Sequence, residues 1–312
     1  MSKTLAPSHV EKCTHRDPQG LKFMSIVEAA YNKAGLSIGD EAQRVNDTPG
    51  LADLISNFIA ESRLTDKFKD EEVRSNYAYP REYKGPKPIQ EQIKAIAAIL
   101  GLDPTSALEY AKQLPTLDSF VPTDALPWTG WFAIPSVAVL AKKHFPEVID
   151  PAEQYCRAIQ LIHEKLAASR QFFNYREGEI TPQQLRMHAH TAQALARVAE
   201  MQNNGDILIV TAQLGMRHRG RSTRRAREVF VSNEYGHGSL TGGSILLTHP
   251  EREVRWEQLH LDLPGDEFSP VADGQFVRAP VFSFSGDGLK FNTFDVVSAG
   301  EFYGSVSGFL PQ

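Results

Sequence analysis

The hydrophobic pattern of this chain changes at Gly205, and that change decides which class of fold the chain can adopt. Before Gly205, apolar residues recur at spacings of three and four, which is typical of helices with one buried face. After it, short apolar runs and alternating apolar residues indicate β-strands. The sequence therefore predicts an α+β fold: a helical N-terminal half, then a helical hairpin leading into a mixed or antiparallel β-sheet.

Length and proline content predict how this fold is divided. A chain of 312 residues exceeds the size at which one core usually stops growing, so two domains are expected. The predicted parts are a loose tail over 1–20, a helical domain over 21–114, a proline- and tryptophan-bearing linker over 115–135, and an α+β domain over 136–312.

The helical domain is expected to contain four helices and one long loop. Apolar spacing, with glycine or proline at the ends, favours helices over 23–34, 49–59, 89–100 and 105–114. Residues 65–88 are charged and contain three prolines, so they are predicted to form an extended loop.

The α+β domain is expected to begin with a helical hairpin over 150–204. Asp150 and Pro151 have the form of a helix start, and Thr181 and Pro182 repeat that signal ahead of an alanine-rich face. Because alanine side chains are small, the two helices of the hairpin are predicted to approach closely.

Strands are expected over the sheet region, 206–312. They are 206–214, 244–248, 259–263 and the pair 281–284 and 289–294. Asp287-Gly288 between the last two is a strong hairpin signal. The glycine-rich run 235–243 resembles a phosphate loop, but a simple strand–helix–strand unit would place it at the opposite sheet end from the arginine-rich loop. A tight or flexible connection is therefore expected there.

Positive charge is concentrated in one short segment of a mildly acidic chain. Six arginines fall between Arg217 and Arg227, although the net charge of the protein is −5. Residues 1–150 contain twelve lysines and five arginines, whereas 151–312 contain two lysines and fourteen arginines. Since arginine presents a planar fork that binds phosphates and carboxylates bidentately, the second half is expected to use its positive charge for recognition or internal pairing.

The arginine segment, Arg217–Arg227, is predicted to form an anion site. A loop over 215–221 follows the strand 206–214, and Ser222 is placed to cap a helix over 223–233, whose N-terminus favours anions. No Walker A lysine follows the glycines. The candidate anion-binding residues are Arg217, His218, Arg219, Arg221, Ser222, Arg224 and Arg225. The alternative is internal pairing of these arginines with Asp262, Asp266, Glu267 and their neighbours.

A second set of residues has the chemistry of a divalent-metal site. His260 and Asp262 are two apart on an expected strand and would share a face, and Asp266 and Glu267 follow closely. The alternative is a solvated strand face that ends in an acidic loop. Nucleophilic catalysis has no local signature, since neither a G-x-S-x-G elbow nor a C-x-x-C motif occurs.

The expected function is binding of a phosphate-bearing anionic ligand, such as a nucleotide or a nucleic-acid end, at the arginine segment. One alternative is a structural or assembly protein in which the arginines contact a protein partner or another copy of the chain. Another is a metal-dependent enzyme acting on phosphoesters. With two cysteines, no secretory leader and no apolar stretch of membrane-spanning length, the expected location is cytoplasmic, without a membrane partner.

Overall fold

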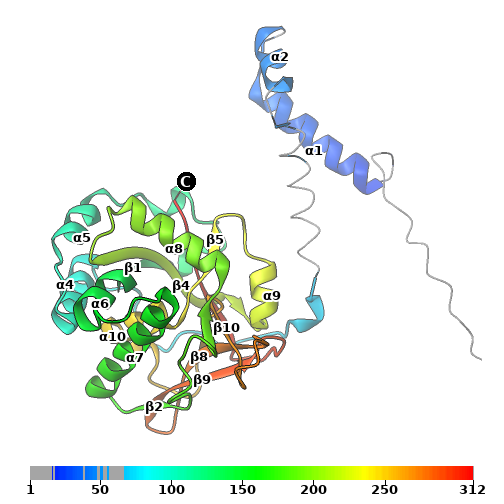
Figure 1. Ribbon diagram of the computed structural model, residues 1–312. Helices are drawn as coiled ribbons and strands as arrows, with labels where there is room; N and C mark the ends of the chain where they lie inside the picture. The colour runs from blue at the N-terminus through cyan, green and yellow to red at the C-terminus, as the bar shows by residue number, and fades with distance from the viewer. Residues whose placement is uncertain are drawn as a thin grey trace, which may run out of the picture. The chain divides into compact units, whose positions relative to one another are not determined.

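The chain forms two compact units, Met1–Arg63 and Leu64–Gln312, in a computed structural model that describes residues 16, 18–37, 39–47, 50–51, 55 and 67–311. The described part of the first unit contains α1 (Pro18–Ala34) and α2 (Asp40–Asn46) (Figure 1). Helix α1 ends at Gly35, whose φ of 62° suits a glycine, as predicted. Most of the expected helix 49–59 lies outside the described residues.

The second unit is built on one mixed sheet, to which the described residues contribute ten strands. The main path along the sheet runs in the order β1 (Thr129–Pro135), β4 (Ile207–Arg219), β10 (Gly304–Phe309), β6 (Leu261–Asp262), β8 (Arg278–Ser285), β7 (Asp266–Phe268) and β3 (Leu185–Met187). Three further strands pair off this path: β5 (Glu234–Gly236) with β10, β9 (Gly288–Asp295) with β8, and β2 (Phe172–Asn174) with β9. The β10–β6 and β2–β9 pairs are parallel and the other pairs antiparallel. The α+β class is as predicted.

Helices surround this sheet. They are α4 (Ile89–Leu100), α5 (Thr105–Tyr110), α6 (Val137–His144), α7 (Pro151–Ser169), α8 (Ala189–Met201), α9 (Thr223–Glu228) and α10 (Ser239–Thr248), with short 3-10 helices η1 (Lys69–Glu71), η2 (Ala111–Gln113), η3 (Leu117–Ser119), η4 (Leu126–Trp128) and η5 (Pro250–Arg252). The expected helices 89–100 and 105–114 are confirmed, the second with a 3-10 last turn. Among the described residues, no helix combines the length and apolar character needed to cross a bilayer.

The predicted linker over 115–135 is wrong at its C-terminal end. Its last seven residues are β1, which pairs along its whole length with β4, from Thr129 opposite Gln213 to Pro135 opposite Ile207. The prolines punctuate short 3-10 turns, but Phe132 and Ile134 are buried in the core. The boundary between the units lies at Arg63 instead of after a helical domain that ends at 114.

The predicted helical hairpin is also wrong, although its first helix is confirmed. Helix α7 begins at Pro151, and the Asp150 carboxylate accepts from Glu153 N at 3.2 Å. Helix α8 begins at Ala189 instead of near Thr181, because 185–187 form β3 against β7. Helix α7 packs against α6 and α10, whereas α8 packs against β4 and β5 (Figure 1). Two strands, β2 and β3, separate the helices in sequence and join different partners in the sheet.

The predicted strand 244–248 is part of the buried helix α10. Backbone glycines explain the difference: a Cβ on Gly242 would lie 2.7 Å from Leu263, and one on Gly243 would lie 2.6 Å from Ile162. The glycine-rich run therefore lets helix α10 pack closely against its neighbours. The apolar run 244–248 is too short for its hydrophobic spacing to distinguish a strand from a helix. The β8–β9 hairpin is confirmed, but its turn residues are Gly286 and Asp287 instead of the predicted Asp287-Gly288, because Gly288 already pairs with Ser285.

Candidate anion-binding site

Strand β4 extends through the first arginines, so the predicted loop over 215–221 is wrong. The strand continues to Arg219 because β10 pairs with it up to Gly304, across an irregularity at Gly215. At Gly215, whose φ is 109°, the Gln213 side chain accepts from Gly215 N at 2.9 Å and from Arg217 N at 3.1 Å. The chain then turns at Gly220, and Ser222 caps α9 by accepting from Arg225 N at 3.0 Å, as predicted. Helix α9 ends at Glu228, earlier than the expected 233.

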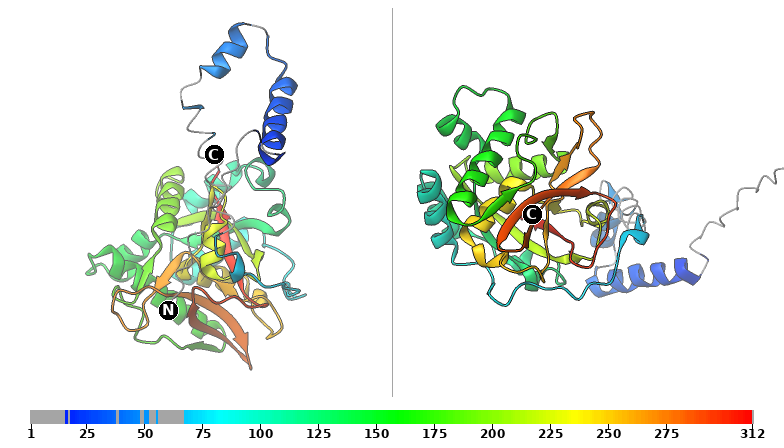
Figure 2. Two further views of the ribbon diagram at one scale, coloured as in Figure 1. Left: turned by 90° about the vertical axis from the view of Figure 1, so that its right-hand side faces the viewer. Right: turned by 90° about the horizontal axis from the view of Figure 1, so that it is seen from below.

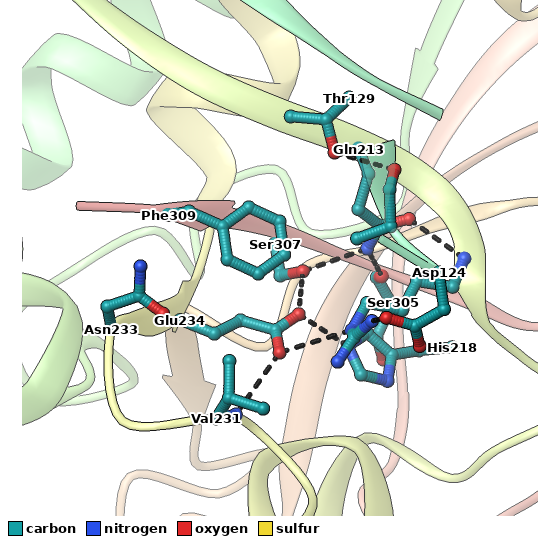
Figure 3. Close-up of polar contacts among 12 residues, drawn as sticks. Asp124, Thr129, Gln213, His218, Val231, Asn233, Glu234, Ser305, Ser307 and Phe309 are labelled. Atoms are coloured by element: carbon teal, nitrogen blue, oxygen red, sulfur yellow. Dashed lines mark hydrogen bonds and ion pairs between the residues drawn. The ribbon is translucent and has the colours of Figure 1, made fainter. Parts of the chain in front are cut away.

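The inner end of the arginine segment belongs to a closed polar network around Glu234 on β5 (Figure 3). One carboxylate oxygen accepts from His218 Nε2 at 2.7 Å and from Ser307 Oγ at 2.5 Å, and the other lies 3.3 Å from Arg217 Nε. Arg217 also forms an ion pair with Asp124 at 2.5 Å. Because Glu234, His218 and Ser307 are fully buried, this network is part of the core and not a surface site.

The protonation states in this network follow from its hydrogen bonds. The Arg221 guanidinium lies 3.0 Å from His218 Nδ1, and since it can only donate, Nδ1 accepts and Nε2 carries the proton given to Glu234. Burial lowers the pKa of His218, so this imidazole is neutral. Burial alone would raise the pKa of Glu234, but His218 and Arg217 outweigh that effect and the pKa lies below its usual value. Glu234 is therefore a buried anion balanced by Arg217.

A strap, residues 67–77, pairs with the middle of the arginine segment. It carries η1 and forms an antiparallel bridge between Glu72 and Arg221, next to a hydrogen bond from Val73 N to Gly220 O at 2.8 Å. The right-hand view of Figure 2 shows this part of the chain, in cyan, on the outside of the second unit. The strap thus brings two glutamates, Glu71 and Glu72, to the arginines.

The Glu71 carboxylate occupies the position predicted for an external anion at the start of α9. Ser222 Oγ donates to it at 2.7 Å, and Arg224 forms an ion pair with it. Glu72 is bound in the same way by Arg225 and Arg221. Partial burial acts to raise the pKa of both glutamates, but the arginine contacts outweigh it and hold both pKa values below the usual range. Internal pairing therefore occurs here with carboxylates that the sequence did not indicate.

The last arginine of the segment binds carbonyl oxygens. Arg227 donates to the backbone oxygens of Pro264 at 2.9 Å and Asp266 at 2.7 Å. Glu267 instead pairs with Arg186 on β3 at 2.8 Å. The expected pairing of the arginine segment with the side chains of Asp262, Asp266 and Glu267 is therefore not what the structure shows.

Two exposed arginines, Arg74 and Arg219, remain at the outer end of the site; we call them the outer arginines. Arg219 is exposed and makes one hydrogen bond, from Nη1 to the backbone oxygen of Tyr77 at 3.2 Å. Arg74, on the strap, is also exposed and has no hydrogen bond or ion pair with the described residues. Their chain neighbours Val73 and Gly220 are in backbone contact, so both side chains originate from one small region. Arg74 lies far from the arginine segment in sequence, and no local sequence pattern indicates that it belongs to the site.

The four residues expected to hold a metal make contacts with different parts of the structure. His260 packs against Phe302, with 4.6 Å between ring centroids, while burial raises the pKa of Asp262 to about 7. Asp266 accepts from Tyr155 Oη at 2.7 Å and from the first amide of α10 at 2.6 Å. In the described part of the chain, no three His, Cys, Asp or Glu side chains are grouped to bind a metal. The hydrogen bond from the first amide of α10 places the carboxylate of Asp266 at the N-terminus of that helix, which is where a phosphate loop would bind its ligand.

Comparison with known proteins adds no functional information. No family model matches the chain, and no curated protein and no solved structure is similar to it.

Proposed function

We propose that the protein is a binding module for a phosphate-bearing anionic ligand, such as a nucleotide or a nucleic-acid end, held by Arg74 and Arg219. One observation carries the proposal. These two arginines are exposed and have no carboxylate partner among the described residues, whereas Arg217, Arg224 and Arg225 are each neutralised by a glutamate or an aspartate.

The outer arginines are like charges that originate close together. Two guanidinium groups on adjoining backbones repel each other, and a bound phosphate would replace that repulsion with charge-assisted hydrogen bonds. Each guanidinium carries five N–H donors, and Arg219 uses one of them within the chain. Arg221 and Arg224 beside them are already paired with Glu72 and Glu71, so the outer arginines supply the unbalanced positive charge.

The two other functional classes have less support. An assembly contact through Arg221, Arg224 and Arg225 would have to displace Glu71 and Glu72, which already pair with them within the chain. A metal-dependent enzyme would need ligands that converge, and the expected ones are separated. A cytoplasmic location is part of our proposal, supported by the free, buried thiol of Cys156.

The experiment is calorimetric titration of the full chain with inorganic tripolyphosphate. Wild type is expected to bind, and the double variant Arg74→Ala/Arg219→Ala to bind at least tenfold more weakly with an unchanged melting temperature. A charge-matched control, Lys112→Ala/Arg157→Ala, removes two cations from exposed surface pairs and should bind like wild type. Absence of binding by wild type, or an equal loss in the control, would overturn the proposal.

A further inference from the structure

An aromatic groove lies between the chain segment that follows the strap and the start of β1. It is a cavity of about 210 Å³ lined by Tyr79, Tyr83, Lys84, Pro86, Pro127 and Trp128, among others. The ring of Tyr79 meets the rings of Tyr83 and Trp128 edge to face, with centroids 5.3 and 6.1 Å apart. Drug-sized ligands occupy about 300–1,000 Å³, so this groove is of a size to accept one planar ring system and not a whole large ligand.

The groove is held in place from the core side. The Tyr79 hydroxyl accepts from Leu214 N on β4 at 2.9 Å, and the buried guanidinium of Arg252 lies 4.7 Å from the Tyr79 ring centroid. Trp128, in contrast, is 41% exposed. A fixed ring beside an exposed one forms a preorganised stacking surface that requires little reorganisation to bind.

Charge favours an anionic occupant. Exposed Lys84 lines the groove, and no carboxylate does. The outer arginines lie beside the same stretch of chain, because Arg74 precedes it on the strap and Arg219 donates to the backbone oxygen of Tyr77, two residues before Tyr79. Along the chain, Tyr79 is at most about 7 Å from Tyr77 and at most about 18 Å from Arg74, so a phosphate on the outer arginines and a base in the groove can belong to one short strand. Proline-rich peptides also bind aromatic grooves, but they would leave these three cations without a partner.

We propose that the ligand is single-stranded nucleic acid, with a phosphate on Arg74 and Arg219 and a neighbouring base in the aromatic groove. This inference rests on the proposed function and names its ligand class. Aromatic stacking together with a positive track along the backbone is how proteins bind single strands with little sequence preference. The base contributes through its π-face, so removing either the base or the ring of Trp128 should weaken binding about tenfold.

The test is fluorescence anisotropy with two labelled oligomers of equal length and charge: a single-stranded thymidine 12-mer and an abasic 12-mer. Wild type should bind the thymidine oligomer at least tenfold more tightly. Trp128→Ala should lose that preference, whereas Trp128→Phe should keep most of it, and thermal melting establishes that both variants are folded. Arg74→Ala/Arg219→Ala should weaken binding of both oligomers.

The outcomes separate the two proposals. Equal affinity of wild type for the two oligomers, with the arginine effect intact, would overturn the base-binding inference and leave phosphate binding in place. Binding of tripolyphosphate but of neither oligomer would also overturn the inference alone. If wild type binds neither tripolyphosphate nor either oligomer, both the phosphate-binding proposal and the base-binding inference are overturned. If a decaproline peptide binds in the groove and the thymidine oligomer does not displace it, the groove is a peptide-binding site instead.

Discussion

The inner and outer ends of the arginine site differ in what the rest of the chain supplies to them. At the inner end, Arg217 is 9% exposed and faces the fully buried carboxylate of Glu234. At the outer end, two residues further along the same strand, Arg219 is exposed and receives one backbone carbonyl. The role of each arginine is thus decided by whether tertiary structure brings a carboxylate to it, and the same residue type is structural at one end and available at the other.

The largest effect is expected when the inner network loses its anion. Glu234→Ala leaves the buried Nε2 proton of His218 without an acceptor and leaves Arg217 with only the exposed carboxylate of Asp124, which together should cost about 3 kcal/mol of unfolding free energy. Urea unfolding followed by circular dichroism measures it. Glu234→Gln, which keeps the shape and one acceptor, should cost clearly less. A loss below about 1 kcal/mol for the alanine variant would mean that the inner end is not structural.

Asp262 is a buried carboxylate without a cation partner among the described residues, in contrast to Glu234 with Arg217. Asp262 is as deeply placed as Glu234, but one of its oxygens lacks a hydrogen-bond partner, and burial raises its pKa from 3.8 to about 7. The folded state therefore holds the proton more tightly than the unfolded state. Stability falls as the pH rises from about 4 to about 7, by about 4 kcal/mol in total.

Asp262→Asn removes that pH dependence. The variant should be more stable than wild type above pH 7, by up to about 4 kcal/mol, and nearly equal to it at about pH 4. Urea unfolding at a series of pH values gives the difference between the two curves. A constant difference at all pH values would show that Asp262 does not titrate in this range.

Intermediate effects are expected where the strap meets the arginines. Glu71→Gln/Glu72→Gln keeps hydrogen-bonding capacity but removes three partly exposed ion pairs, so it should cost only about 1–2 kcal/mol. Because Arg221, Arg224 and Arg225 lose their internal anions, affinity for tripolyphosphate should increase several-fold. Calorimetric titration measures the affinity, and weaker binding than wild type would show that the strap glutamates assist the ligand instead of competing with it.

The smallest stability change is expected at the outer end. Arg74→Ala/Arg219→Ala removes two exposed cations without carboxylate partners, so the unfolding free energy should stay within about 0.5 kcal/mol of wild type. Urea unfolding provides the value. A loss as large as that of the strap variant would show that the outer arginines also stabilise the fold.

Local signals in the sequence predicted local structure well. Caps are set by residues close in sequence, so Ser222 at α9 and Asp150 at α7 were predictable, as was the β8–β9 hairpin. The α+β class followed from the change in hydrophobic period at Gly205.

Features that depend on distant partners were not predictable in this way. Strand β4 continues through polar arginines because β10, some ninety residues later, pairs with it. The anions of the site come from Glu71, Glu72 and Glu234, and neither the strap nor β5 has a pattern that announces such a contact. Arg74 becomes part of the site only because the strap crosses Gly220.

The salt dependence of single-strand binding tests most directly whether the outer arginines hold phosphate. Affinity for the thymidine 12-mer is measured between about 50 and 200 mM salt for wild type and for Arg74→Ala/Arg219→Ala. Each phosphate contact contributes about 0.7 to the slope of log Kd against log salt concentration for single strands, so the variant slope should fall by about 1.4. An unchanged slope with unchanged affinity would contradict the account and place the phosphate contacts elsewhere on the molecule.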